Sequence, residues 1–493
     1  MIISDLINVL YWWLIFFVIS LVFLPLTSKI FSSFFDKGYA FSKILGLLLI
    51  SYTVWLLASL KILPFNFFSI ILVLIPFLLI NLKFLKELKL LKIYFLEEGL
   101  FLGGFIFWAF IKAHEPSIHG LEKFMDFGFI NSTLRSDFFP PKDMWLAPET
   151  INYYYFGHFI SALLIKFTNV LPEIGYNLTL ASLFGLCFSA SFSIGSNLYN
   201  FFLKSKQSSP LIHNTFPIIP GLISAFLVTL GGNLQTIYIF FQSYKTENPV
   251  PFWLLPLVFN PDGYWYPNAT RFIPFTIHEF PIYSFVVSDL HGHVFDIPFV
   301  LLLIALLIKI FFSSKFLTFD FCLLSLLIAV FLMTNVLDGP IYLLVILAVF
   351  LVKKLITPIS LISLISQITL IIIGAIIFSL PFWFSFKPFA SGIGVVCAPD
   401  FLINISRFGP FLFEADHCAR SPLWMLLILW GFPLFIVLTF LFKHLNFTHL
   451  SFRGRHGDRG NLPVDILALI LAGTAFILIL IPEFFYAKDI YPA

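Results

Sequence analysis

Apolar runs of about twenty residues recur along the whole chain, and they restrict its fold more than any other feature. A helix of that length crosses the hydrocarbon core of a bilayer and satisfies its own backbone hydrogen bonds. Hydrophobic residues make up 59% of the 493 positions and charged residues only 11%, which excludes an ordinary soluble globular protein. The sequence therefore predicts an all-α, polytopic integral membrane protein with about 12 transmembrane helices. The expected spans are residues 7–26, 43–60, 66–82, 93–112, 176–202, 217–241, 294–312, 318–336, 340–352, 361–384, 422–442 and 464–481.

The distribution of charge gives these spans an orientation. Segment 153–168 is apolar but short, with tyrosines at one end and Lys166 near the other, which suits a juxtamembrane helix lying in the outer interface. If this segment does not cross, more than half of the 29 lysines and arginines share one side, Lys204 and Lys206 among them. The positive-inside rule makes that side cytoplasmic and places the protein in the cytoplasmic membrane. The basic loop 443–459 then contacts anionic membrane lipid, and no nucleic-acid partner is expected.

The first loop on the opposite side, residues 113–175, carries the most unusual polar residues of the chain. It contains Glu122-Lys-Phe-Met-Asp126, the proline pair Pro140-Pro141, and Asn152-Tyr-Tyr-Tyr-Phe-Gly-His158. Loops held by a rigid scaffold often carry chemistry. The carboxylates and aromatic residues of this loop are therefore candidate site residues.

A second outside loop ends in Asp289-Leu-His-Gly-His293, directly before a predicted span. Asp289, His291 and His293 are spaced so that they could converge on a metal ion or a phosphate. The alternative is that Asp289 only caps the following helix. The segment from Thr334 to Tyr342 is predicted to be a tight turn between two spans.

A further outside loop, residues 385–421, holds Arg407 and Arg420, whose guanidinium groups could bind a phosphate. They could equally pair with Glu414 and Asp416. Cys397 and Cys418 lie in the same loop. They could form a disulfide or equally remain as two free thiols.

These motifs resemble the signature of the YYY membrane protein family, a prokaryotic family defined by a domain of unknown function. The resemblance rests on the segments Glu122 to Asp126, Phe139 to Asp143, Asn152 to His158 and Asp289 to His293. It implies an N-terminal three-helix membrane region (1–92) and a YYY domain (93–493). The family continues beyond Asp489, so the resemblance also implies a C-terminally truncated chain, with the missing part expected from a separate chain.

The family is similar in layout to the GT-C superfamily of membrane glycosyltransferases, which implies sugar transfer from a polyprenyl-phosphate donor at the outer face. The implied catalytic residues are Asp126 as the base and Glu122, which would orient it or hold a divalent ion (Mg or Mn). Asp289, His291 and His293 would hold a metal or the leaving phosphate. The implied substrate-binding residues are Tyr153, Tyr154, Tyr155, His158, Arg407 and Arg420. The alternatives are a transporter or channel and a lipid-binding membrane protein.

Overall fold

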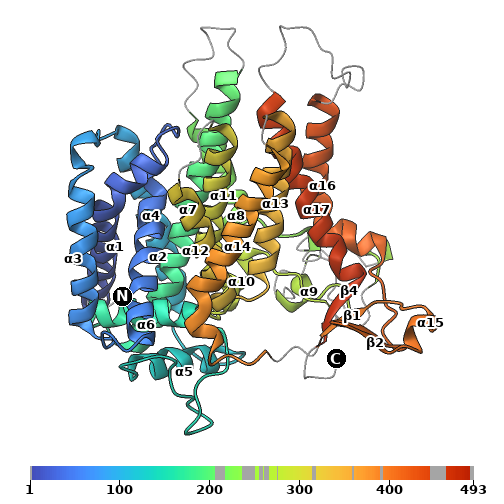
Figure 1. Ribbon diagram of the computed structural model, residues 1–493, viewed down its shortest axis with the longest axis horizontal. Helices are drawn as coiled ribbons and strands as arrows, with labels where there is room; N and C mark the ends of the chain where they lie inside the picture. Colours follow the sequence, from blue (N-terminus) through green and yellow to red (C-terminus); the bar gives the residue numbers. More distant parts are fainter. Residues whose placement is uncertain are drawn as a thin grey trace. The chain divides into compact units, whose positions relative to one another are not determined.

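The computed structural model describes residues 3–205, 217–235, 250–254, 259, 266–274, 276–313, 318–357, 360–388, 392–444 and 462–488. The chain divides into two compact units. Unit 1 comprises Met1–Leu230 and Ser288–Phe386, and unit 2 comprises Gly231–Val287 and Lys387–Ala493. Figure 1 colours the elements of both along the sequence. The boundary expected between residues 92 and 93 falls inside unit 1.

Unit 1 is a bundle of helices formed by the apolar runs (Figure 1). Its helices are α1 (Ile3–Ile30), α2 (Tyr39–Ser59), α3 (Phe67–Leu82), α4 (Lys92–His114), α5 (Lys123–Leu134), α6 (Phe156–Thr168), α7 (Pro172–Ser205), α8 (Ile218–Thr229), α11 (Gly292–Phe312), α12 (Thr318–Thr334), α13 (Asp338–Ile356) and α14 (Leu361–Trp383), with a 3-10 turn η1 (Leu85–Glu87) between α3 and α4. Helix α7 packs against α4, α8 and α11 and is mostly buried. It is the central helix of unit 1.

The described residues include nine helices long and apolar enough to cross a membrane, which confirms a multi-pass integral membrane protein. They are α1, α2, α4, α7, α11, α13 and α14 of unit 1, with α16 (Leu423–His444) and α17 (Leu462–Leu480) of unit 2. The other three predicted spans fall on α3, α8 and α12, which are apolar but shorter than 18 residues. The nine long helices therefore account for most of the expected spans.

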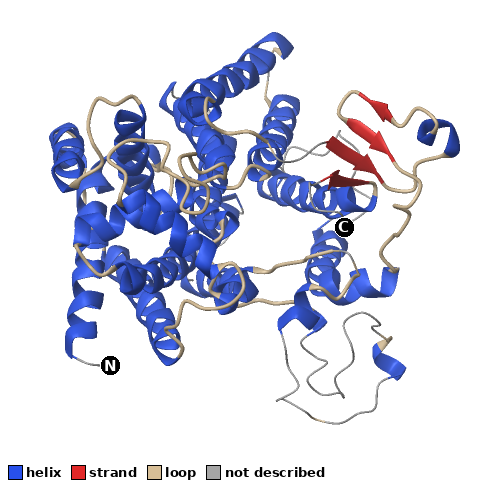
Figure 2. Cartoon of the chain, turned by 90° about the horizontal axis from the view of Figure 1, so that it is seen from below, coloured by secondary structure: helices blue, strands red, loops and turns tan. Residues whose placement is uncertain are grey.

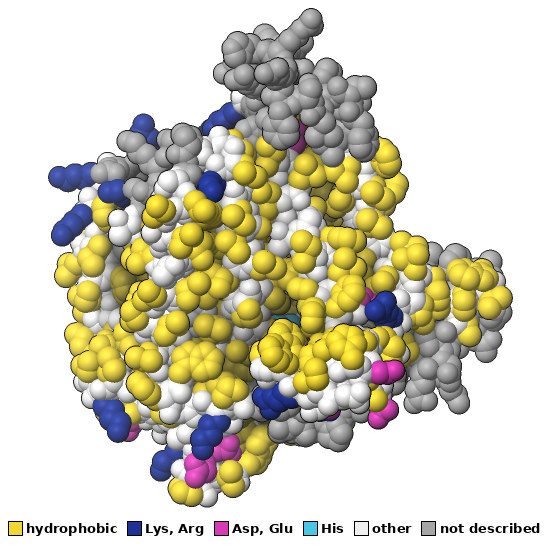
Figure 3. Space-filling view, turned by 45° about the vertical axis from the view of Figure 1, so that its right-hand side comes forward, with side chains coloured by type: hydrophobic (Ala, Val, Ile, Leu, Met, Phe, Trp, Pro, Cys, Tyr) yellow, Lys and Arg dark blue, Asp and Glu magenta, His cyan; other side chains and the backbone are white. Residues whose placement is uncertain are grey.

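The two ends of unit 1 differ in charge. One end, here called the basic end, is where α1, α3 and α7 finish and α4 begins, and it carries Lys29, Lys83, Lys92 and Lys204. Helices α5 and α6 lie at the opposite end, here called the acidic-loop end (Figure 1). Figure 3 shows a wide band of hydrophobic side chains, with Lys and Arg at its upper left edge and both basic and acidic side chains along its lower edge. Lys204 follows the predicted sorting of charge, whereas Lys206 lies outside the described residues.

Helix α6 does not cross the bundle, as predicted, and it is buried within the protein. Its 13 residues span about 20 Å at 1.5 Å per residue, which is short of a hydrocarbon core about 30 Å thick. Every residue of the helix except Lys166 is buried. It packs against α2, α3, α5, α7, α11 and α12. Protein therefore encloses α6, and its place at the membrane surface stays a prediction.

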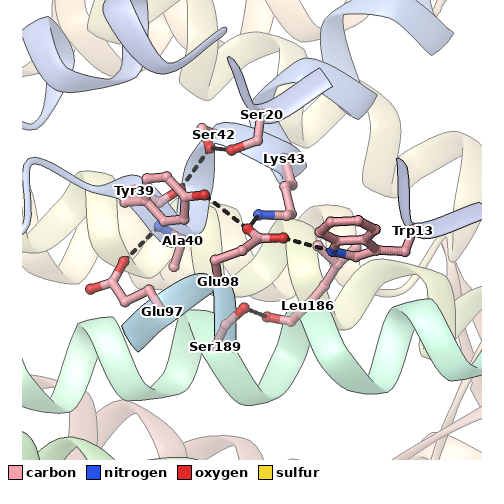
Figure 4. Close-up of polar contacts among 10 residues, drawn as sticks. All are labelled: Trp13, Ser20, Tyr39, Ala40, Ser42, Lys43, Glu97, Glu98, Leu186 and Ser189. Carbon is pink, nitrogen blue, oxygen red and sulfur yellow. Dashed lines mark hydrogen bonds and ion pairs between the residues drawn. The ribbon is translucent and has the colours of Figure 1, made fainter. Parts of the chain in front are cut away.

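A polar network lies inside the bundle between α1, α2 and α4 (Figure 4). Glu98 accepts hydrogen bonds from Trp13 Nε1 and the Tyr39 hydroxyl, both 2.8 Å away, and forms an ion pair with Lys43. Its neighbour Glu97 is buried and accepts from the Ala40 N–H at 3.0 Å. Glu97 and Glu98 thus connect α4 to α1 and α2. Their partners matter because an unpaired charge inside a membrane protein is costly.

The described residues are mostly helical, as predicted, and unit 2 adds a small sheet (Figure 2). The order is β2 (Arg407–Phe408), β3 (Phe411–Phe413), β1 (Gly392–Val395), β4 (Phe485–Lys488), with β1 parallel to β3 and antiparallel to β4. A disulfide joins Cys397 to Cys418 beside the sheet. The remaining elements are η4 (Phe252–Leu254), α9 (Tyr266–Thr270), α10 (Pro281–Val287), α15 (Asp400–Ile403), α16, α17 and η7 (Ile481–Glu483).

Candidate functional site

Two glycines allow the conspicuous motifs to meet at the acidic-loop end. Gly157, at the start of α6, packs so closely on Phe295 of α11 that an added Cβ would overlap the ring. Gly292, at the start of α11, packs on the Thr334 carbonyl in the same way. Helix α6 therefore packs closely against α11, and the start of α11 packs against the end of α12. The segment that leads into α11 lies beside the start of α5.

Asp126 is fully buried in the first turn of α5 and pairs with His158 of α6. His158 Nε2 lies 2.9 Å from Asp126 Oδ1, and the imidazole packs between Phe129 and Phe295. Asp126 Oδ2 and His158 Nδ1 have no hydrogen-bond partner among the residues that the structure describes. His158, expected to bind substrate, is instead the buried partner of Asp126.

Asp289 lies in a backbone segment held by a tyrosine of α7. The Tyr176 hydroxyl donates to the Ser288 carbonyl at 3.1 Å and accepts from the Leu290 N–H at 3.2 Å. Burial of the Asp289 carboxyl, reinforced by the charge of Asp126, raises its pKa to about 6. The helix α11 is capped at His291 without a side-chain bond, so the helix-cap alternative for Asp289 is wrong.

His291 forms an ion pair with the exposed Glu122, which stands at the start of α5. Burial alone would lower the pKa of His291. The bond to Glu122 and the charges of Asp126, Glu122 and Asp289 outweigh burial and raise that pKa to about 9. The imidazole is therefore a cation at neutral pH, next to an aspartate that ionises near pH 6.

Two lysines add positive charge beside these carboxylates. Lys112 ends α4 and donates to the Glu115 carbonyl at 2.7 Å, and its charge acts on Asp289. Lys123 opens α5 and also acts on Asp289. The structure thus brings Glu122, Asp126, Asp289 and His291 together with two ammonium groups.

The three tyrosines before α6 have different positions. Tyr155 is 2% exposed, and its hydroxyl accepts a hydrogen bond from Trp55 Nε1 at 3.2 Å. It is a core residue, unlike the substrate contact expected from the sequence. Tyr153 and Tyr154 are half-buried with ring centroids 3.9 Å apart, and Tyr153 also contacts Phe129 and lies near Glu122 and Asp126. These two rings border the carboxylate cluster.

Within the described ranges, no group of three His, Cys, Asp or Glu side chains is arranged to hold a metal ion. The expected ligands share a stretch of chain, but their partners differ. His291 is paired with Glu122, while the ring of His293 stacks 5.9 Å from that of His291 and lies near Asp338. The three side chains do not fit a common divalent ion in this arrangement.

Arg407 and Arg420 belong to unit 2. Arg407 is exposed on β2, and its Nε donates to the Gly409 carbonyl at 3.1 Å. Arg420 lies over the ring of Phe484. Glu414 pairs with Lys488 and accepts a hydrogen bond from Tyr486, so the expected alternative of an Arg–Glu414 pair is wrong.

The sequence interpretation missed Tyr176, Lys112 and the closely packed glycines. Tyr176 stands near the start of a predicted span, where a tyrosine is usually an interface residue. Lys112 ends a span in the same way. In the sequence, what distinguishes these two residues is that they stand at the ends of predicted spans next to the acidic loop.

Comparison with known proteins gives one match. A family model described as "Uncharacterized membrane protein (DUF2298)" matches residues 49–457. No curated protein and no solved structure matches the chain significantly.

Proposed function

The chain belongs to the DUF2298 family of uncharacterized membrane proteins, and we propose that this member is a glycosyltransferase using a polyprenyl-phosphate sugar donor. The observation that carries the proposal is that the buried Asp289 carboxyl lies within the electrostatic reach of His291 and Lys123, at one end of a membrane-spanning bundle. A lipid-linked phosphate donor presents its sugar at the membrane surface. The acidic-loop end of unit 1 is where such a donor and a polar acceptor would meet.

The reaction needs a base for the acceptor and cations for the leaving phosphate. The acceptor oxygen attacks the anomeric carbon, and its proton passes to the Asp289 carboxylate. The bond between that carbon and the phosphate oxygen breaks, and its electron pair leaves with the polyprenyl phosphate. His291 as a cation, with Lys112 and Lys123, would neutralise the phosphate.

Asp289 is better suited to act as the general base than Asp126, the residue expected in that role from the sequence. A general base works best when its pKa lies near the operating pH, and the pKa of Asp289 is about 6. Asp126 is fully buried and bonded to His158. In the proposal Asp126 is a positioning residue, whose charge raises the proton affinity of Asp289.

Glu122 has a positioning role of the same kind, because its carboxylate holds His291 as a cation. Tyr153 and Tyr154 offer half-buried rings that a sugar could stack on. Arg407 and Arg420 receive no role, since their described contacts lie within unit 2. No step depends on a metal ion.

The GT-C-like layout inferred from the sequence is supported by the order of elements. The acidic loop after α4 leads into the non-spanning α6, and Asp289 stands directly before α11. This order puts one aspartate in each of two loops at the same end of the bundle.

The test is donor turnover by membranes that contain the full chain, with labelled polyprenyl-phosphate sugars and a cell extract as the source of acceptors. Wild-type membranes are expected to release polyprenyl phosphate and transfer the label. Asp289→Asn should reduce transfer by about 10²-fold or more, whereas Asp137→Asn, an exposed residue of the first outside loop, should not. Equal activity of both variants, or passage of unaltered label across the membrane, would contradict the proposal.

A further inference from the structure

A second carboxylate pair lies behind the candidate site, where three helix ends meet in unit 1. Asp296 is in the second turn of α11, Thr334 is the last residue of α12, and Asp338 is the first residue of α13. Asp296 and Thr334 are fully buried. Within the described ranges, neither carboxyl oxygen of Asp296 has a partner in hydrogen-bonding geometry, and the Thr334 hydroxyl has none either.

The groups that face Asp296 come from its own helix and from two others. Asp338 is the charged group that acts on it, and Asp338 itself accepts a hydrogen bond from Asn335 Nδ2 at 3.0 Å. The Thr334 hydroxyl faces Asp296 from α12. The imidazole of His293 lies near Asp338, and the Tyr342 phenol lies near both carboxyls.

Asp296 is fully buried, whereas Asp338 is partly exposed. Charging both carboxylates at once is unfavourable, because desolvation of Asp296 and the mutual repulsion act in the same direction. An ionised Asp296 could accept a hydrogen bond from the Thr334 hydroxyl, but its other oxygen would face Asp338 without a donor, which is unfavourable in a buried place. A single proton removes both penalties. A protonated Asp296 can donate to Asp338, and the Thr334 hydroxyl can then donate to the remaining oxygen of Asp296.

We propose that Asp296 and Asp338 form a proton-binding site, a carboxylic acid–carboxylate pair that holds one proton and fixes the loop carrying Asp289. Thr334 links the two features, since Gly292 packs directly on its carbonyl oxygen. Loss of the proton would drive the ends of α11 and α13 apart. The segment 288–293 would then lose the surface on which it rests. This inference does not depend on the identity of the transferred group.

The test measures the melting temperature of the full chain in detergent from pH 5 to pH 10, at constant ionic strength in choline chloride. A proton bound more tightly in the folded protein stabilises it at low pH, and this stability is lost as the pH rises through the proton's release. Wild type is therefore expected to lose several degrees at alkaline pH. Asp296→Asn keeps the shape and an N–H donor toward Asp338 but cannot titrate, so it should lose less than wild type, and the remaining loss comes from Asp289 and His291. Asp137→Asn should behave as wild type.

If Asp296→Asn does not fold, the proposal is still tested by a second variant, Asp338→Asn, and by infrared spectroscopy. In Asp338→Asn the remaining Asp296 stays a neutral acid, and the alkaline loss should again be reduced. Infrared difference spectra should show a carboxylic C=O band in wild type that disappears in Asp296→Asn. Absence of that band, or a melting temperature that rises with Na⁺ in wild type but not in Asp296→Asn, would overturn the proposal, since the pair would then be ionised and hold a metal cation.

Discussion

At the scale of the residue, Asp289 combines poor solvation with a like-charged neighbour. Burial first, and then the charge of Asp126, raises its pKa to about 6. Such a group stabilises the folded protein while it is protonated, at low pH, and this contribution is lost as the pH rises through 6. Asp289 is thus a residue kept at a cost in stability, as is common at functional sites.

The first prediction concerns Asp289→Asn. The amide cannot ionise, so this variant avoids the cost of a buried charge at this position. At pH 8 the free energy of unfolding should rise by about 1–3 kcal/mol, and the gain should vanish near pH 4, where the wild-type carboxyl is protonated. Thermal unfolding at the two pH values measures this. A variant that is less stable than wild type at pH 8 would show that the carboxylate is well solvated or paired.

The second prediction concerns the pH dependence of transfer. Activity requires Asp289 ionised and His291 protonated, so it should rise through pH 6 and fall through pH 9. In His291→Gln the alkaline fall should disappear while the acid limb remains. An unchanged alkaline limb in this variant would show that the limb does not come from His291.

At the scale of the element, the helices were predictable and their packing was not. An apolar run near twenty residues requires only local information, so α2, α7 and α11 lie where the sequence predicted spans. The burial of α6 and the pairing of His158 with Asp126 depend on helices far apart in the chain. The strands of unit 2 are two to four residues long and leave too little pattern to be recognised.

The third prediction concerns the contact between α11 and the end of α12. Gly292→Ala places a methyl group against the Thr334 carbonyl, and the overlap should cost about 1–3 kcal/mol. Transfer activity should fall with it, because the segment carrying Asp289 must shift. Gly99→Ala is the matched control: it also lies in a helix, with no atom within 4 Å of the added Cβ, and should be neutral or slightly stabilising. Equal melting temperatures of the two variants would mean that α11 moves freely.

At the scale of the whole molecule, the two units are stabilised in different ways. Unit 1 has a large apolar core with buried ion pairs such as Lys43–Glu98 and Lys309–Asp320. Unit 2 has a small sheet with a disulfide beside it. A covalent bond helps most where little apolar surface can be buried.

The fourth prediction is that this disulfide stabilises unit 2 selectively. It joins cysteines 21 positions apart, and closing a loop of that size is worth about 3 kcal/mol. Cys397→Ser/Cys418→Ser should therefore become sensitive to protease between residues 392 and 421, while cleavage within unit 1 stays unchanged. Cys322→Ser, at an exposed free cysteine, is the control. Resistance of the double variant would show that the sheet alone holds this segment.

The Lys43–Glu98 pair has a consequence for how the protein is made. The two residues are 55 positions apart, so a ribosome adding about 5–20 residues per second completes Glu98 several seconds after Lys43. During that interval α2 carries an ammonium group without its carboxylate, which disfavours release into lipid. Helices α1 to α4 should therefore leave the translocation machinery together rather than one by one. Nascent chains that end before α4 should remain extractable by alkaline carbonate, and chains that include α4 should not.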